Sequence, residues 1–162
     1  MTTEASGLPD TGSTAPAFTL KSDAGQLVAL ESYRGSWVVL YFYPKDDTPG
    51  CTVEALEFSG LAKEFDREGA KIFGVSPDSE KKHCKFREKF DLNITLLCDE
   101  DHAMAVSYGV WVEKSMYGRK YMGMQRATLL IDPQGKVVCV WPKVTPKGHA
   151  QQVLDELRKL KG

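Results

Sequence analysis

The segment Trp37–Phe42 constrains the fold most, because an unbroken run of apolar residues leaves no polar face to turn toward solvent. Such a run, rich in β-branched and aromatic residues, is typical of a strand that is buried on both faces of a mainly parallel sheet. A polar turn follows, and then Thr48, Pro49 and Gly50 suit the N-cap and first residues of a helix. We therefore predict a buried strand followed by a helix that runs to about Glu68.

Cys51 falls in the first turn of this predicted helix. The unpaired backbone N–H groups and the positive end of the helix dipole favour an anion there, so a thiol in this place ionises more readily than a free cysteine, whose pKa is about 8.5. We expect Cys51 to be largely thiolate at neutral pH. The alternative is a cysteine that only fills a corner of the core, but packing alone does not account for the Thr-Pro-Gly sequence that precedes it.

Beyond this unit, strand patterns and helix patterns alternate along the chain. The expected elements are strands over 17–20 and 27–30 around a turn at 23–25, a strand over 71–75, a helix from the turn at 76–79 to about 90, a strand over 95–97, a helix over 99–108, a loop or ragged hairpin over 115–123, strands over 127–131 and 136–141, and a helix over 148–160. This order predicts an α/β protein with a central mixed sheet flanked by helices and an N-terminal β-hairpin extension. The 162 residues are expected to form a single domain, 1–162, in which we expect residues 1–12 to be flexible.

Composition excludes several classes of partner. The formal net charge of -1 shows no basic surplus, so neither nucleic acid nor an anionic membrane surface is expected to bind. Residues 1–15 lack the pattern of a secretory signal, and no stretch reaches the roughly 18 apolar residues of a membrane span. The four cysteines, Cys51, Cys84, Cys98 and Cys139, contain no Cys-x-x-Cys pair. This argues against a disulfide scaffold and against dithiol chemistry of the thioredoxin type, and it indicates a reducing, cytoplasmic setting.

The segment Tyr41–Thr52 reads Tyr-Phe-Tyr-Pro-Lys-Asp-Asp-Thr-Pro-Gly-Cys-Thr, and it resembles the active-site signature of the peroxiredoxins, in particular the bacterioferritin-comigratory or Q-type subgroup. Four more segments carry the resemblance, namely 15–20, 74–79, 126–132 and 148–150. It implies a thioredoxin-like fold and a thiol peroxidase that reduces hydrogen peroxide and organic hydroperoxides, with neither a cofactor nor a metal. It also implies thioredoxin or a similar thiol as reductant, and a monomer, with a dimer as the alternative.

The resemblance assigns the catalytic roles. Cys51 would be the peroxidatic nucleophile, which attacks the terminal peroxide oxygen and becomes a sulfenic acid. The Thr48 hydroxyl would bind the peroxide or the thiolate, Pro44 would shield the sulfur from water, and Arg126 would favour the thiolate by its charge and help to hold the peroxide. Each has a simpler alternative: Thr48 only a helix cap, Pro44 only the end of a strand, and Arg126 only a solvated cation.

Two further residues support these roles. The backbone N–H groups of Gly50 and Cys51 are placed to stabilise charge on the oxygen pair during the attack. Glu54 would orient the Arg126 guanidinium, although a carboxylate in a first helical turn is favoured in any case.

The resolving cysteine is less determined. Many members of the subgroup carry it five residues after the peroxidatic one, where this chain has Leu56, and others carry it on the next helix, at the position of Arg87. Cys84 lies one helical turn earlier than Arg87, on a face that we expect to be polar and exposed, so it is the candidate resolver. A disulfide would require local unfolding of one or both helix starts. Cys98, Cys139 or no resolving cysteine at all are the alternatives.

Other functions have less support. His83, Cys84, Cys98 and His102 are zinc-type ligands, but their spacing fits no finger or ribbon, so no metal site is expected. His102 and His149 are expected as helix-start and surface residues. A thiol–disulfide oxidoreductase is disfavoured because Cys-x-x-Cys is missing, and a non-enzymatic module is disfavoured because Thr48, Cys51 and Arg126 are all present.

Overall fold

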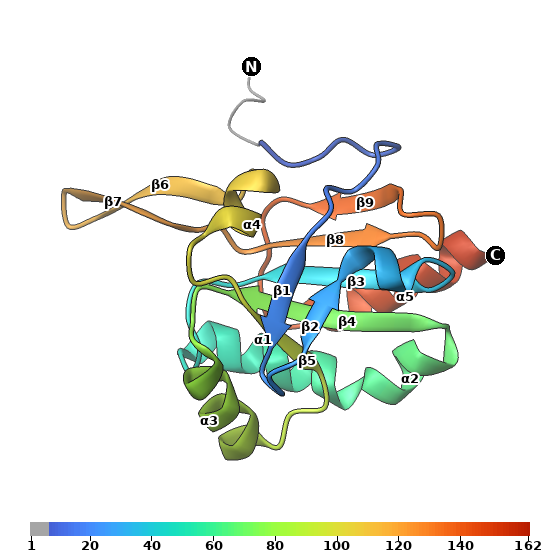
Figure 1. Ribbon diagram of the computed structural model, residues 1–162, viewed down its shortest axis with the longest axis horizontal. Helices are drawn as coiled ribbons and strands as arrows, with labels where there is room; N and C mark the ends of the chain where they lie inside the picture. Colours follow the sequence, from blue (N-terminus) through green and yellow to red (C-terminus); the bar gives the residue numbers. More distant parts are fainter. Residues whose placement is uncertain (1–6) are drawn as a thin grey trace.

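The computed structural model describes residues 7–162 and shows a central sheet with helices packed on it (Figure 1). The elements are β1 (Thr19–Ser22), β2 (Leu27–Ala29), the short 3-10 helix η2 (Leu30–Tyr33), β3 (Trp37–Phe42), α1 (Pro49–Gly60), α2 (Ala62–Arg67), β4 (Ala70–Ser76), α3 (Glu80–Phe90), β5 (Thr95–Cys98), α4 (Ala103–Ser107), β6 (Trp111–Met116), β7 (Arg119–Met124), β8 (Ala127–Ile131), β9 (Val137–Trp141) and α5 (His149–Lys161). Strands and helices therefore alternate as the sequence predicts.

The main sheet has seven strands in the order β2-β1-β5-β4-β3-β8-β9. The central strands β3, β4 and β5 run parallel, whereas β8 is antiparallel to β3 and β1 is antiparallel to β5. The predicted mixed sheet is confirmed, and the expected N-terminal hairpin is the β1–β2 pair at one edge.

Strand β3 is buried on both faces because its alternate side chains enter two separate cores. Val38, Leu40 and Phe42 pack in the core that α4 covers. Val39 and Tyr41 pack in the other core, with side chains from α1, α2, α3 and α5. The end of β3 therefore delivers the following loop and α1 to the centre of the second core.

Two segments differ most from the prediction, while the helix expected over 99–108 is shorter, as α4, and the strand expected over 17–20 is shifted to β1. The helix expected over 49–68 is interrupted at Leu61 into α1 and α2, after the Ser59-Gly60 pair, and such pairs favour breaks. The expected ragged hairpin over 115–123 is a regular two-stranded sheet, β6–β7, that projects from the body (Figure 1). Its turn residues Tyr117 and Gly118 both have positive φ, 54° and 78°, as a tight two-residue hairpin turn requires.

The start of the described chain contacts the body of the protein at several points. Leu8 is buried, and the Gly12 backbone N–H donates to Val137 O at 2.7 Å. Gly109, with φ +73°, lies so close to Gly7 that a Cβ at Gly109 would be 2.1 Å from the Gly7 carbonyl carbon. The flexibility expected for residues 1–12 stays a prediction, and residues 1–6 of that range lie outside the described residues. Within residues 7–162, none of the helices has the length and hydropathy needed to cross a bilayer.

Candidate active site

Cys51 lies in the first turn of α1, directly after the loop that leaves β3. This loop, residues 43–48, is called the catalytic loop below. The Cys51 side chain is only 1% exposed. Thr48 occupies the N-cap position with extended backbone angles, and its carbonyl accepts from Thr52 N at 2.8 Å. Its hydroxyl does not cap the helix but donates to Lys45 O at 2.9 Å. The first-turn N–H groups of α1 therefore have no side-chain cap and can bind an oxygen near the thiol.

Arg126 joins the thiol to a buried carboxylate. It precedes β8, whose first residue, Ala127, pairs with Phe42 at the end of β3. One terminal nitrogen, Nη2, donates to Cys51 Sγ at 3.3 Å, and the other, Nη1, donates to Glu54 Oε1 at 2.7 Å. Burial opposes the charge of the guanidinium, but Cys51 and Glu54 outweigh this and raise the pKa of Arg126 above its ordinary value. Arg126 therefore stays cationic against the sulfur.

Glu54 carries an incompletely bonded carboxylate. Its side chain is 0% exposed, and Oε2 has no hydrogen-bond partner among residues 7–162. Burial raises the pKa of Glu54 to about 7 despite the opposing effect of Arg126. Glu54 therefore changes protonation near neutral pH, directly beneath the guanidinium that touches the thiol.

This raised pKa predicts a stability change with pH. The Glu54 pKa is about 7 in the folded protein and 4.5 ordinarily, so the folded state binds the proton more tightly. This contribution to the free energy of unfolding is complete below pH 4.5 and is lost as the pH rises through 7. Relative to Glu54→Gln, the free energy of unfolding of the wild type should fall by about 3 kcal/mol across this range. Urea unfolding at a series of pH values measures the difference. Glu68→Gln is the control of opposite sign, because Lys161 and Arg158 lower the pKa of the half-buried Glu68. Parallel profiles for wild type and Glu54→Gln would contradict the prediction.

Gly50 provides the space for the guanidinium. A Cβ at this position would lie 3.1 Å from Arg126 Nη2 and 3.4 Å from Pro146 Cγ. The sequence analysis missed Pro146, because nothing in its local context places it beside α1. Pro44 is half-buried and directly follows Tyr43, whose N–H makes the last main-chain bond to β4, to Val75 O at 3.0 Å.

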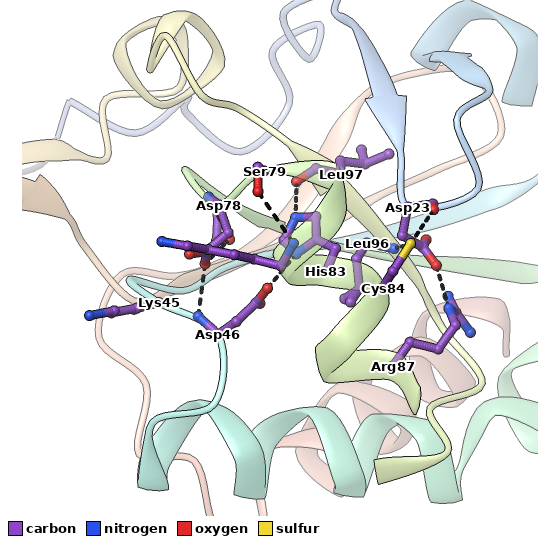
Figure 2. Close-up of polar contacts among 12 residues, drawn as sticks. Asp23, Lys45, Asp46, Asp78, Ser79, His83, Cys84, Arg87, Leu96 and Leu97 are labelled. Atoms are coloured by element: carbon purple, nitrogen blue, oxygen red, sulfur yellow. Dashed lines mark hydrogen bonds and ion pairs between the residues drawn. The ribbon is translucent and has the colours of Figure 1, made fainter. Parts of the chain in front are cut away.

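Cys84 differs from its expected environment. It is half-buried rather than exposed, because the turn after β1 covers it, and its Sγ donates to Asp23 O at 3.0 Å (Figure 2). Burial and the Asp23 carboxylate raise the pKa of this thiol. Arg87, which occupies the position of the resolving cysteine in some relatives, bonds the Asp23 carboxylate and two carbonyls beyond α3. Helix α3 is thus fastened to the β1–β2 turn.

Cys51 and Cys84 are held near opposite ends of one row of paired residues. The row crosses the sheet through Ser22, Leu97, Val75, Phe42 and Ala127. Asp23, which binds Cys84, adjoins the first residue of this row, and Arg126, which binds Cys51, adjoins the last. Four strand spacings of about 4.8 Å separate the two ends by about 19 Å. A disulfide requires Cα atoms within about 7 Å. Because the two sulfurs are bonded to different partners, a Cys51–Cys84 disulfide requires that Cys84 leave Asp23 O or that Cys51 leave Arg126 Nη2.

The other two cysteines lie on strands. Cys98, at the end of β5, is buried, and burial together with Glu100 raises its pKa to about 12. Cys139 is half-buried on β9, opposite Leu130, and burial raises its pKa as well. Both thiols are therefore weaker nucleophiles than an ordinary cysteine at neutral pH.

A buried polar cluster beside the catalytic loop was missed by the sequence analysis, which considered His83 only as a zinc-type ligand. His83 Nδ1 lies 2.7 Å from Asp46 Oδ2, and Nε2 lies 2.9 Å from Leu97 O (Figure 2). Asp78 Oδ2 accepts from Asp46 N at 2.8 Å. Potential metal-ligand atoms of three residues, His83, Asp46 and Asp78, lie within 4.8 Å of one another. Within residues 7–162 this is the one such group of three or more His, Cys, Asp or Glu side chains. Both ring nitrogens already have partners, so the cluster is bonded within itself.

The prediction for the other two histidines holds for the position of His102 but not for the exposure of His149. His102 directly precedes α4, as expected, and stacks on Trp111 with ring centroids 3.8 Å apart. His149 is buried rather than on the surface, and its Nε2 lies 2.8 Å from Thr128 Oγ1.

A buried cysteine at a helix N-terminus, bonded to an arginine over a mixed α/β sheet, defines a thiol-based peroxidase of thioredoxin-like fold. Residues 11–140 match the model of the AhpC/TSA family. The chain belongs to this family, and it is a thiol-dependent peroxidase of the peroxiredoxin type.

Similar proteins agree on the subgroup. The chain is 46% identical to peroxiredoxin Bcp of Bacillus subtilis over 149 residues, which cover 92% of this chain and 95% of that one. It is 40% identical to peroxiredoxin Bcp of Escherichia coli over 148 residues, covering 91% and 95%. A peroxiredoxin Q of Xylella fastidiosa superposes with a TM-score of 0.90 at 36% identity, covering 94% of this chain and 98% of that one. The bacterioferritin comigratory protein of Xanthomonas campestris, studied for alkyl peroxide reduction, superposes with a TM-score of 0.87 at 41% identity, covering 97% and 99%. The predicted resemblance and fold class are confirmed.

Proposed function

We propose that this peroxidase acts as a single domain that reduces hydrogen peroxide and alkyl hydroperoxides with Cys51 as the peroxidatic nucleophile. The observation that carries the proposal is the 3.3 Å contact between Arg126 Nη2 and Cys51 Sγ, in a helix turn whose N–H groups have no side-chain cap. The thiolate attacks the terminal oxygen, the O–O bond breaks, and the sulfur becomes a sulfenic acid. The leaving oxygen takes a proton and departs as water or an alcohol.

The groups around Cys51 stabilise charge and bind the peroxide during this step. Arg126 stabilises the thiolate and the charge that develops on the oxygens, and the N–H groups of Gly50 and Cys51 assist it. Thr48 has already donated its hydrogen to Lys45 O, so its oxygen lone pairs are available to accept the hydroperoxide O–H. Glu54 holds the guanidinium in place.

Pro44 has a different role in the proposal. Pro44 lies in the catalytic loop just after β3, and there it excludes water from the Cys51 sulfur. Its half-buried position directly after the buried Tyr43 supports this role.

We further propose that the Cys51 sulfenic acid condenses with the Cys84 thiol, which forms a disulfide and releases water. Among the three other cysteines, Cys84 alone lies in a helix near its N-terminus, and a helix end unwinds more readily than a strand held by its ladder. A dithiol of the thioredoxin type then reduces the disulfide. The protein works as a monomer in the cytoplasm, and the wide spacing of its four cysteines, without a Cys-x-x-Cys pair, supports such a reducing setting.

A non-reducing mass map tests the recycling step. After one equivalent of cumene hydroperoxide, the wild type should lose two thiols and yield a peptide pair that links Cys51 to Cys84. Cys84→Ser should instead keep a sulfenic acid at Cys51, which dimedone traps, while Cys98→Ser and Cys139→Ser should behave as the wild type. A stable Cys51 sulfenic acid in the wild type would favour the one-cysteine alternative, in which an external thiol reduces Cys51 directly.

A further inference from the structure

His83 connects the two segments that carry the reacting cysteines. It lies in the first turn of α3, directly before Cys84, and its Nδ1 reaches Asp46 on the catalytic loop, five residues before Cys51. Its other ring nitrogen reaches Leu97 O on β5 (Figure 2). The side chain is fully buried. One imidazole therefore ties the start of α3 both to the loop and to the sheet.

Asp46, on the catalytic loop, makes three hydrogen bonds. Its Oδ2 faces His83, its Oδ1 accepts from Tyr43 OH at 2.6 Å, and its N–H donates to Asp78 Oδ2. Asp78 also accepts from Ser76 Oγ at 2.7 Å, at the end of β4. The loop that leads to Cys51 is thereby fastened at Asp46 to the turn before α3.

The bonds of His83 suit a doubly protonated ring. Beside an ionised Asp46, both partners, the Asp46 carboxylate and the Leu97 carbonyl, accept hydrogen bonds, and an imidazolium donates to both. Buried ion pairs of this kind cost several kcal/mol when one partner is removed, because an unpaired charge is left in the core. The pair therefore resists any movement that separates α3 from the catalytic loop.

A movement of this kind brings Cys84 to Cys51 in the proposed disulfide. In the structure Cys84 Sγ is bonded to Asp23 O and Cys51 Sγ to Arg126 Nη2, and unwinding the first turn of α3 withdraws His83 from both of its partners. The exposed ion pair between Lys89 and Asp47, at 2.8 Å, also links α3 to the loop, but exposed pairs contribute little.

We propose that His83 is a positioning residue of the peroxidase cycle: its bonds to Asp46 and Leu97 hold the catalytic loop and α3 in the peroxide-reactive arrangement, and their release limits the rate at which Cys84 reaches oxidised Cys51. The rate-limiting part rests on the Cys51–Cys84 disulfide of the proposed function. The restraint on α3 does not, because it already exists in the reduced protein.

Hydrogen exchange and stopped-flow kinetics test the two parts separately. In the reduced protein, His83→Gln should speed exchange of the amides of residues 83–86, which bond back to the first turn of α3, about ten- to hundredfold, the loss expected for a buried charged hydrogen bond. After one equivalent of peroxide, Cys51–Cys84 disulfide formation should accelerate by a similar factor, whereas the preceding oxidation of Cys51 should slow. This opposite change in two steps of one cycle is not expected from general destabilisation.

Two variants serve as matched controls. His149→Gln removes a second buried histidine, on α5, that contacts neither α3 nor the catalytic loop in its hydrogen bonds. Lys89→Met removes the exposed link between α3 and the loop. Neither should change α3 exchange or disulfide formation more than about twofold. Unchanged α3 exchange in His83→Gln would overturn the restraint. Faster exchange without any Cys51–Cys84 disulfide in either protein would overturn the rate-limiting part and the resolving role of Cys84 together.

The wild-type protein offers a second measurement that needs no substitution. The charged and titratable groups around His83 are Asp46 and Asp78, with Tyr43 behind Asp46. Burial lowers the pKa of His83, but bonds to Asp46 and Leu97 and the charge of Asp78 outweigh it, so the pKa lies above 6.5. The restraint is then complete below 6.5 and is lost as the pH rises through the raised value. The protection factors of the amides of residues 83–86, which bond back to the α3 first turn, should fall over that interval while those of β3 stay constant. Equal changes in both sets of amides would refute the proposal.

Discussion

Cys51→Ser should abolish peroxide reduction, with no turnover above the uncatalysed reaction for either hydrogen peroxide or an alkyl hydroperoxide. A serine hydroxyl does not ionise at neutral pH, so Arg126 and the first-turn N–H groups of α1 would have no anion to stabilise and the O–O bond would have no nucleophile. Stopped-flow consumption of peroxide by the reduced protein measures the effect.

The remaining cysteines provide the controls for this result. Cys84→Ser, Cys98→Ser and Cys139→Ser should each retain the first oxidation step at close to the wild-type rate, because none of these thiols contacts Arg126 in the structure. Equal peroxide consumption by Cys51→Ser and the wild type would remove Cys51 from the mechanism.

Arg126→Met should slow the oxidation of Cys51 by about 10²- to 10³-fold, the usual effect of removing one donor that stabilises developing charge in a buried site. The substitution keeps the volume of the side chain but removes both donors, to Cys51 Sγ and to Glu54 Oε1. The rate constant for oxidation, followed by intrinsic tryptophan fluorescence, reports the loss.

Two further arginine variants separate charge from geometry. Arg126→Lys should recover only part of the rate, because one ammonium group cannot reproduce the planar fork that binds sulfur and carboxylate together. Arg158→Met removes an exposed arginine that pairs with Glu64 and Glu68, and it should leave oxidation unchanged. An Arg126→Met rate within a fewfold of the wild type would show that the guanidinium is not part of the chemistry.

Local patterns predicted most of the fold. The limits of β3 were predicted to the residue, because a strand buried on both faces is apolar along its whole length. The start of α1 followed from the Thr-Pro-Gly sequence, whose conformational preferences are local. The break at Leu61 and the full length of β6 and β7 were not predicted. The Ser59-Gly60 pair permits the break, but its position depends on packing, since α1 packs mainly against α5 and α2 packs mainly against β4. The projecting β6–β7 sheet has too little burial to produce a clear apolar alternation.

The part of the site that lies on α1 could also be predicted from local sequence. Thr48, Gly50, Cys51 and Glu54 lie within one short segment, so their mutual positions follow from the helix alone. The resemblance supplied Arg126. Pro146 beside Gly50 and the bonds of His83 could not be predicted, because they join segments that are far apart in the chain.

The sequence by itself determined that Cys51 begins a helix after a buried strand, since capping preference and hydrophobic pattern are properties of neighbouring residues. Only the tertiary structure decided what surrounds each thiol. The pairing of β8 with β3 brings Arg126 to Cys51, and the packing of α3 against the β1–β2 turn covers Cys84. These contacts depend on the order of strands in the sheet, which long-range burial of both cores determines and which no local pattern encodes.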